Sequence, residues 1–545
     1  MLAFVVLVCL PWLNPLASGP SPAVLPLLTS LACTGFLLLR QRISLLVWQP
    51  LVPVLSLGLA IGWRSQSIGG DVLLSWACLL LISGCIALGA HFSREPQTLR
   101  ALAWAWLVAA TLSSVFGLVQ HFGLAHHFYP FISQSADNTA FANLRQRNQL
   151  ATLTCIGLAA LIWLIRSPGQ VLARTTGRGS KLATCAAVLI ALLVAVNAMT
   201  TSRAGMSQLV VLLWLAWLWR EGLPLKVRRL LLLVPPVYVL AAWLLPWIEG
   251  VTRGNAFARI AGEAGCTSRQ ALWANVWQLI AEKPSTGWGW RELAWAHYET
   301  HFEPRFCQIV DNAHNLPLHL AVELGLPVAL AACAVLLYAL WRGKPWRETD
   351  PTRQLAWSVL LCIGVHSMVE YPLWYGPFQM AAGMAAGLLW GSRSGAPDPT
   401  EKHTAQATVI RAMLGVVLLA SSLLAGREYQ RVSQIYLPVE ERQPQYREDT
   451  LARIGSTWLF DNQLQFARLS VTPLTAANAP EMHLLAQRLL HYSPEPRVIE
   501  VLIESASLMG NLEAALAEAR RYKEAFPRDY AQWQAQRAPQ APPTR

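Results

Sequence analysis

Charged residues are scarce in this chain of 545 residues. Asp, Glu, Lys and Arg make up 14% of it, while 54% is hydrophobic; charged residues form roughly 25% of an ordinary soluble domain. The mean hydropathy is +0.36. These values exclude a soluble globular enzyme and indicate an all-α protein with many membrane-spanning helices.

Several catalytic motifs are also missing. The sequence contains no Walker A loop, no HExxH, no DxD spacing and no CxxC, which excludes the usual ATPases, zinc proteases and metal-dependent nucleotide-sugar transferases. We therefore expect no metal ion and no cofactor. The net charge of +12 would suggest a nucleic-acid partner for a soluble protein. In a membrane protein, however, the distribution of basic residues reflects which loops face the cytoplasm, so no nucleic-acid partner is expected.

Apolar stretches close to the length of a bilayer span recur along the chain and predict about thirteen transmembrane helices. The first and twelfth are short. The thirteen stretches lie at 2–16, 24–39, 43–63, 73–90, 101–119, 149–165, 182–199, 206–219, 230–248, 316–341, 355–369, 375–390 and 407–425.

The loops between these stretches differ in positive charge. One set holds eighteen Lys and Arg, and the alternate short loops hold only Arg64, Arg145, Arg147 and Arg203. Because cytoplasmic loops carry the excess of Lys and Arg, the first set is predicted to be cytoplasmic. In a bacterial inner membrane, the long loop at 249–315 and the segment after residue 425 then face the periplasm.

Cysteine placement fits this topology. Eight of the ten cysteines fall inside predicted spans, where cysteine usually packs as a small apolar residue, but Cys266 and Cys307 share the long outer loop. An oxidising periplasm permits a disulfide between them, and we predict one; two free thiols are the alternative.

A composition change divides the chain. Residues 1–425 form the predicted transmembrane domain, residues 426–537 a polar helical periplasmic domain, and residues 538–545 a Pro-rich tail expected to be disordered. The stretch from Val498 to Asp529 resembles one tetratricopeptide-type helical hairpin, with Gly510 at its turn and a weaker copy before it. An ordinary amphipathic helix pair is the alternative.

Polar residues gather at the predicted periplasmic ends of the spans. RQRNQLA supplies Arg145, Arg147 and Gln149, TTSRAGM supplies Arg203, and the outer loop holds Arg269 in TSRQALW. The run DNAHNLPLHLAVELG brings His314 and Asn315 to the start of the tenth span. In HSMVEYPLWY, His366 and Glu370 are four residues apart and so share a helix face.

These residue types suit an anionic lipid headgroup. Guanidinium groups form charge-assisted contacts with phosphate oxygens, and an imidazole can orient or deprotonate a hydroxyl near neutral pH. The alternatives are arginines that extend to headgroups at helix ends and a structural histidine. Glu323, nine residues after His314 in the same predicted span, is interpreted as an intramembrane polar contact with an unidentified partner.

With these motifs the sequence resembles the O-antigen ligase and polymerase superfamily, and within it the bacterial protein O-oligosaccharyltransferases (pilin glycosylation ligases). The resemblance rests on RQRNQLA, TSRAG, SRQALW followed by PSTGWGW, AHNLPLHLAVELGLP and EYPLWY, from Asn138 to Trp390. It implies catalytic roles for His314, Arg203 and Arg269, and substrate contacts for Arg145, Arg147, Gln149, Asn315, Glu370 and Tyr371.

The activity implied by the resemblance is transfer of a preassembled oligosaccharide from undecaprenyl pyrophosphate to Ser or Thr of a pilin or other periplasmic protein. The arginines would take the place of a metal at the leaving pyrophosphate, and attack from the opposite face predicts inversion at the anomeric carbon. An O-antigen ligase that modifies lipid A core, an O-antigen polymerase and, from another class, a lipid-linked sugar transporter are the competing interpretations.

Overall fold

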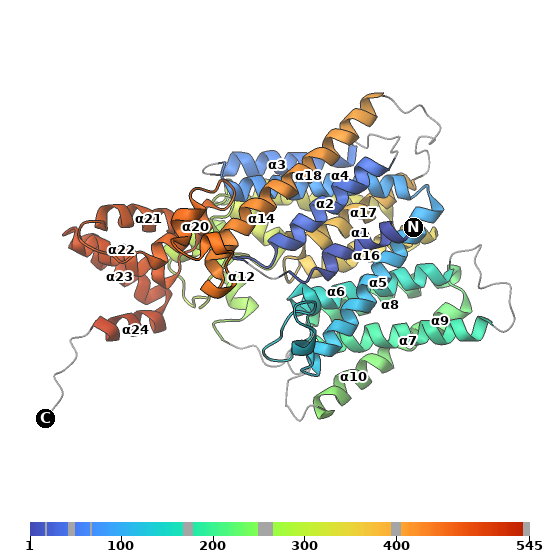
Figure 1. Ribbon diagram of the computed structural model, residues 1–545. Coiled ribbons are helices and arrows are strands. Elements are labelled where there is room, and N and C mark those ends of the chain that lie inside the picture. Colours follow the sequence, from blue (N-terminus) through green and yellow to red (C-terminus); the bar gives the residue numbers. More distant parts are fainter. Residues whose placement is uncertain are drawn as a thin grey trace. The chain divides into compact units, whose positions relative to one another are not determined.

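The structure is a computed structural model that describes residues 1–16, 19–41, 49–65, 68–166, 178–248, 265–393 and 405–537. Within these ranges all regular secondary structure is helical (Figure 1). The predicted disordered tail, residues 538–545, and the first part of the long outer loop, residues 249–264, lie outside them. The all-α prediction is therefore confirmed for the described residues.

The chain divides into two compact units. Unit 1 comprises Met1–Gly58, Ser75–Gly262 and Ala334–Arg427, and unit 2 comprises Leu59–Leu74, Glu263–Cys333 and Glu428–Arg545. Unit 2 therefore joins most of the long outer loop to the C-terminal segment. The sequence-based division at residue 425 assigned these two segments to different domains.

Unit 1 is built mostly from apolar helices. Those lying in it wholly or in part are α1 (Leu2–Leu13), α2 (Val24–Arg40), α3 (Val52–Arg64), α4 (Gly70–Phe92), α5 (Pro96–His121), α6 (Arg147–Arg166), α7 (Arg178–Met199), α8 (Arg203–Leu218), α9 (Leu225–Leu231), α10 (Val234–Ile248), α15 (Leu326–Gly343), α16 (Pro351–Ser367), α17 (Gly376–Gly391) and α18 (Ala405–Ser433).

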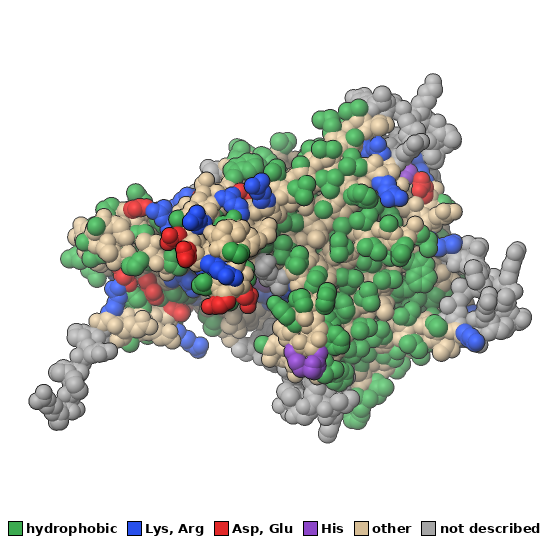
Figure 2. Space-filling model, in the orientation of Figure 1, with side chains coloured by type: hydrophobic (Ala, Val, Ile, Leu, Met, Phe, Trp, Pro, Cys, Tyr) green, Lys and Arg blue, Asp and Glu red, His purple; other side chains and the backbone are tan. Residues whose placement is uncertain are grey.

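Six helical segments in the described residues are long and apolar enough to cross a bilayer, which supports a membrane protein. Shorter apolar helices overlap several other predicted spans, and the count of thirteen stays a prediction. On the face shown in Figure 2, hydrophobic side chains cover much of the outer surface of the unit 1 helices. The six segments long enough to cross a bilayer are Gly70–Phe92, Pro96–His121, Arg147–Arg166, Leu225–Leu244, Leu326–Arg347 and Ala407–Tyr436.

Helix α6 is the centre of unit 1 and packs against α5, α7, α8 and α16 (Figure 1). Small residues allow close helix approach: a Cβ at Gly157 of α6 would lie 2.3 Å from the Cβ of Ala110 on α5. Such small residues are typical of helix interfaces in membranes, where packing rather than apolar burial drives association.

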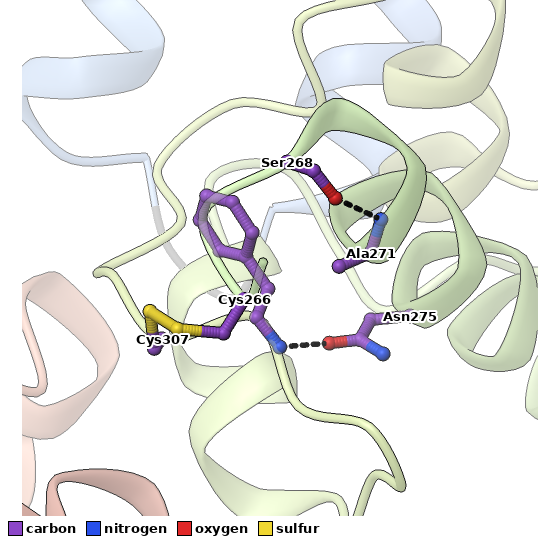
Figure 3. Close-up of a disulfide and its surroundings, with 6 residues drawn as sticks. Cys266, Ser268, Ala271, Asn275 and Cys307 are labelled. Carbon is purple, nitrogen blue, oxygen red and sulfur yellow. Dashed lines mark hydrogen bonds between the residues drawn. A yellow bond between two sulfur atoms is a disulfide. The ribbon is translucent and has the colours of Figure 1, made fainter. Parts of the chain in front are cut away.

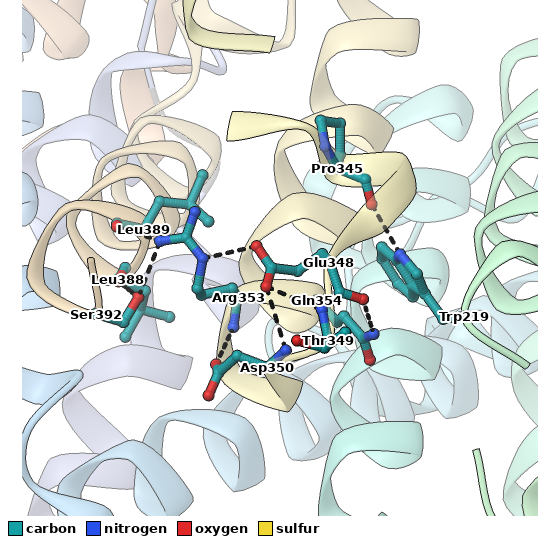
Figure 4. Close-up of polar contacts among 10 residues, drawn as sticks. All are labelled: Trp219, Pro345, Glu348, Thr349, Asp350, Arg353, Gln354, Leu388, Leu389 and Ser392. Carbon is teal, nitrogen blue, oxygen red and sulfur yellow. Dashed lines mark hydrogen bonds and ion pairs between the residues drawn. The ribbon is translucent and has the colours of Figure 1, made fainter. Parts of the chain in front are cut away.

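The loop between α15 and α16, predicted to be cytoplasmic, is fixed by polar contacts (Figure 4). Arg353 Nε donates to Glu348 Oε2 at 2.6 Å, and its Nη1 donates to the Leu389 carbonyl on α17 at 2.8 Å. The Trp219 indole N–H donates to the Pro345 carbonyl at 2.8 Å. These contacts anchor the loop to the ends of α8 and α17.

The predicted span 316–341 is two helices. Helix α14 (Leu316–Leu324) ends at Gly325, whose φ is +90°, and α15 starts at Leu326. A Cβ at Gly325 would lie 2.5 Å from the Ser285 carbonyl oxygen. Glycine permits both this backbone conformation and this close approach, so the apolar run continues while the helix breaks.

Unit 2 has shorter helices and an apolar core around Tyr298, Leu489, Val498 and Ile499. Tyr298 comes from the outer loop, and the others come from α21 and α22, so the loop and the C-terminal helices fold together. The tetratricopeptide likeness stays a prediction. The helices are α12 (Arg269–Glu282), α13 (Leu293–Glu299), α14, α19 (Thr450–Ile454), α20 (Asp461–Val471), α21 (Ala479–Tyr492), α22 (Pro496–Leu508), α23 (Leu512–Ala525) and α24 (Pro527–Arg537).

Candidate active site

The start of α12 carries the first predicted site residue. Ser268 caps the helix by accepting a hydrogen bond from the Ala271 N–H at 3.2 Å, so Arg269 is the first helical residue (Figure 3). Just before the cap, Cys266 is joined to Cys307 in a disulfide, the pair that the sequence predicts. The bond ties the start of α12 to the loop that leads to His314.

Asn275, on the same helix, holds this loop in place. Its Oδ1 accepts the Phe306 N–H at 2.8 Å and faces His297 Nε2 at 3.1 Å, and its Nδ2 donates to the Pro304 carbonyl at 3.0 Å. Asn275 is 3% exposed, so these bonds are shielded from water and a lost partner would be costly.

His314 is brought to Arg269 by this framework. Arg269 Nη2 lies 2.8 Å from His314 Nδ1. The His314 N–H donates to Asn312 Oδ1 at 2.8 Å, and the neighbouring Ala313 carbonyl accepts from the Trp273 indole at 3.0 Å. His314 has a left-handed φ of +50°, which is uncommon outside glycine and is kept here by bonds on both sides.

Asn315 follows as the N-cap of α14, and its Oδ1 accepts the Leu318 N–H at 3.1 Å. The cap stabilises the first turn of α14 and so positions the residue before it, His314. A substrate contact of Asn315 stays a prediction.

The PSTGWGW motif packs against the other end of α14. The N–H groups of Trp288 and Gly289 donate to the carbonyls of Val322 and Glu323, at 2.8 and 3.0 Å. The Glu323 carboxylate is 3.4 Å from His319 Nε2 and accepts the Arg291 N–H at 3.0 Å. The structure thus gives the buried Glu323 protein partners, where the sequence identified none.

Unit 1 gathers a second set of predicted residues. Asn148 on α6 accepts from the Ser202 hydroxyl at 2.7 Å, and its amide lies 3.4 Å from Glu370 Oε1. Ser202 caps α8 and accepts the Gly205 N–H, so Arg203 is the first residue of α8 and Arg147 the first of α6. Helix N-termini carry partial positive charge, which adds to that of the two arginines.

Further along the same helices, buried polar side chains are linked by hydrogen bonds. Thr152 Oγ1 is 2.8 Å from His366 Nδ1 and accepts from Gln208 Nε2 at 2.8 Å. It joins α6, α8 and α16 in the packed interior. No role was predicted for Thr152, Gln208 or Ser202, since a single polar residue in an apolar helix gives no sign of its partner.

The remaining predicted residues have structural neighbours. Arg145 has a left-handed φ of +59°, and its guanidinium donates to the carbonyls of Pro15, at 3.1 Å, and Leu16. Gln149 is buried in the first turn of α6. The Tyr371 and Tyr375 rings stack with centroids 6.2 Å apart. Substrate roles for Arg145, Gln149 and Tyr371 stay predictions.

Three ranges of the chain match three different family profiles of known proteins. Residues 186–333, which contain Arg203, Arg269 and His314, match the family profile described as O-antigen ligase. Residues 140–165 match the profile for protein glycosylation ligase, and residues 354–541 match that for the C-terminal part of virulence factor membrane-bound polymerase.

Two relatives come from Acinetobacter baylyi. The general O-oligosaccharyltransferase is 24% identical over 520 residues, 89% of this chain and 86% of the relative. The ComP-specific O-oligosaccharyltransferase is 22% identical over 319 residues, 58% and 56% of the two chains. The chain is thus similar to O-antigen ligases over residues 186–333 and to protein glycosylation ligases over residues 140–165. It is a membrane glycosyltransferase.

In this glycosyltransferase the predicted catalytic and substrate-binding residues lie in two groups, one in each unit. Unit 2 brings Arg269 and His314 together, whereas unit 1 brings Glu370 to Asn148 beside the first residues of α6 and α8. The Arg269–His314 contact links residues 45 positions apart, and the sequence supplied both residues without showing that they touch.

Proposed function

We propose that the protein transfers a preassembled oligosaccharide from undecaprenyl pyrophosphate to Ser or Thr hydroxyls of periplasmic or pilin-like proteins. Transfer would occur at the periplasmic face of the bacterial inner membrane. The observation that carries the proposal is the Arg269–His314 contact of 2.8 Å within the O-antigen ligase region. The protein glycosylation ligase match and the two O-oligosaccharyltransferase relatives support a protein acceptor.

The chemistry needs an activated donor, because nucleotide sugars are not supplied to the periplasm. The acceptor oxygen attacks the anomeric carbon while the bond to the pyrophosphate oxygen breaks. Negative charge grows on the leaving group, and guanidinium groups stabilise such charge. Arg269, Arg203 and Arg147 are the proposed residues for this role, and attack opposite the leaving group gives inversion. A product with retained configuration would contradict this step.

The disulfide supports the periplasmic assignment of the Arg269–His314 site. Structural disulfides persist in oxidising compartments, and Cys266 is three residues before Arg269. The bond therefore agrees with the Lys and Arg asymmetry, which assigns the same loop to the periplasm.

An O-antigen ligase or polymerase is the second candidate function. The O-antigen ligase match at residues 186–333 and the virulence factor polymerase match at residues 354–541 favour it. In that case the acceptor would be lipid A core or another repeat unit. A lipid-linked sugar transporter is less well supported, since none of the matched families is described as one.

The acceptor is identified by expressing the chain in bacteria that lack their own ligases and supply an undecaprenyl-linked oligosaccharide and a candidate pilin. Both the intact mass of the pilin and the electrophoretic pattern of the lipopolysaccharide would be measured. We expect glycan mass on Ser or Thr of the pilin. Glycan on lipid A core alone would contradict the protein acceptor.

A further inference from the structure

The contact with Arg269 determines which nitrogen of His314 carries the proton. A guanidinium has five N–H donors and no acceptor. At 2.8 Å from Arg269 Nη2, His314 Nδ1 must therefore accept the hydrogen bond. In a neutral imidazole one nitrogen accepts and the other carries hydrogen, so the proton of His314 is on Nε2.

The surroundings fix the backbone that carries the two side chains. The backbone of His314 is tied to Asn312, that of Ala313 is tied to Trp273, and Asn315 caps the helix that follows. Arg269 is held by the Ser268 cap and the neighbouring disulfide. An Nδ1 proton would face the guanidinium N–H, donor against donor. If both ring nitrogens carried protons, two positive charges would also lie side by side.

We propose that His314 stabilises the leaving diphosphate by donating its Nε2–H to a phosphate oxygen. Arg269, besides the charge stabilisation proposed above, positions His314 by fixing this tautomer. This inference rests on the proposed function and changes the role expected for His314 from the sequence. A histidine whose Nε2 already carries a proton cannot receive the hydroxyl proton there. A donor hydrogen bond to the acceptor oxygen would also lower its nucleophilicity, so the leaving group is the better partner.

The step balances without a protein base. The acceptor oxygen forms a bond to the anomeric carbon, and the bond from that carbon to the diphosphate oxygen breaks with both electrons remaining on the diphosphate. The hydroxyl proton passes to a phosphate oxygen of the diphosphate product. Protein orientation and charge stabilisation then provide the catalysis.

Amide substitutions separate the two roles. In His314→Gln the amide nitrogen can occupy the position of Nε2 and donate, but it cannot act as a base. In His314→Asn the shorter amide reaches only the position of Nδ1. We expect His314→Ala and His314→Asn to lose roughly 100-fold or more in transfer rate, and His314→Gln to stay at least tenfold faster than both.

A binding measurement tests the same claim without the acceptor. The inhibition constant of undecaprenyl diphosphate would be measured by its competition with a labelled lipid-linked oligosaccharide for the purified protein. We expect weaker binding in His314→Ala and His314→Asn and a smaller loss in His314→Gln. His301→Gln is the matched control, because His301 is in the same unit and its side chain is 72% exposed.

A base role for His314 gives the opposite pattern. His314→Gln would then be as slow as His314→Ala, and none of the variants would change diphosphate binding, which would overturn the inference. Failure of the proposed function looks different, because the wild type would then transfer no glycan to protein whatever the binding measurements show.

A double-mutant cycle between Arg269→Ala and His314→Gln adds a readout for positioning. The loss of transfer rate caused by Arg269→Ala should be smaller in the His314→Gln background, where no tautomer needs fixing.

Discussion

The predicted site arginines of unit 1 and the predicted catalytic histidine of unit 2 are held in different ways. In unit 1, Arg147 and Arg203 are the first residues of long apolar helices, and the nearby polar contacts join neighbouring helices. In unit 2, His314 lies on irregular backbone with a φ of +50° and is held by side-chain hydrogen bonds and a nearby disulfide. A helix start can position a charge by itself, but an irregular loop needs many specific bonds.

The difference predicts different consequences of mutation. Changing a unit 1 arginine should remove activity and leave the fold intact, because the helix below it is stabilised by apolar packing. Changing a framework residue of unit 2 should lower stability and activity together, because the loop geometry depends on it. The following experiments test this contrast.

The largest effect is expected for Arg203→Ala. Loss of one group that stabilises charge at the leaving group typically costs 10²- to 10³-fold in rate, and the thermal stability in detergent should change little. Initial rates of glycan transfer measure the first quantity. Arg220→Ala is the control, since Arg220 lies just beyond the other end of α8; equal losses in both variants would contradict the assignment.

Gly325→Ala should destabilise unit 2. The substitution combines a φ of +90° with a Cβ only 2.5 Å from the Ser285 carbonyl oxygen, and we expect a loss of about 3 kcal/mol in the free energy of unfolding. Gly510 also has a positive φ, +80°, but nothing lies within 4 Å of its Cβ position. Gly510→Ala should therefore cost only about 1 kcal/mol, and denaturant unfolding of both variants tests the difference.

Tyr298→Phe should loosen the outer loop from the C-terminal helices. The Tyr298 hydroxyl donates to the buried Glu518 Oε1 at 2.5 Å, and burial with the neighbouring carboxylate raises the pKa of Tyr298 well above its usual value. The variant leaves one carboxylate oxygen without this donor, at a cost of about 1–2 kcal/mol. Hydrogen exchange of residues 293–299 should become faster, and unchanged exchange there would argue against the contact.

Low pH should destabilise unit 2 modestly. Burial, together with the charge of Arg305, lowers the pKa of His297 to about 3 from its ordinary 6.5. Below pH 6.5 the unfolded chain binds a proton at His297, while the folded chain leaves His297 neutral. The free energy of unfolding therefore decreases as the pH is lowered from about 6.5 to about 3. The loss from this group is on the order of 1 kcal/mol at pH 5.5, and His297→Gln should reduce the slope of stability against pH.

The sequence predicted the features that depend on composition and on local motifs. Low charge and long apolar runs indicated helices for a membrane, the positions of Cys266 and Cys307 indicated their pairing, and SRQALW and AHN supplied Arg269 and His314. These signals are local, and each can be interpreted without knowing the neighbours in space. The Arg269–His314 contact itself was not predicted, because loop geometry determines it.

Other features depend on contacts that no local pattern shows. The apolar run around Gly325 continues unbroken, so the end of α14 depends on Gly325 meeting Ser285 from another segment. Tyr298 meets Glu518 across 220 positions, and Thr152 meets His366 across 214. Such contacts arise from packing, which periodicity and composition do not encode.

Reconstitution with defined components tests the central claim most directly. The purified protein would be mixed with undecaprenyl-pyrophosphate oligosaccharide and a folded pilin-like acceptor, and intact-protein mass would be followed over time for the wild type, His314→Ala and Arg269→Ala. The account predicts that the wild type adds the mass of one whole glycan to Ser or Thr, and that both variants lose most of the rate while keeping the Cys266–Cys307 disulfide. Transfer by His314→Ala at the wild-type rate would contradict it.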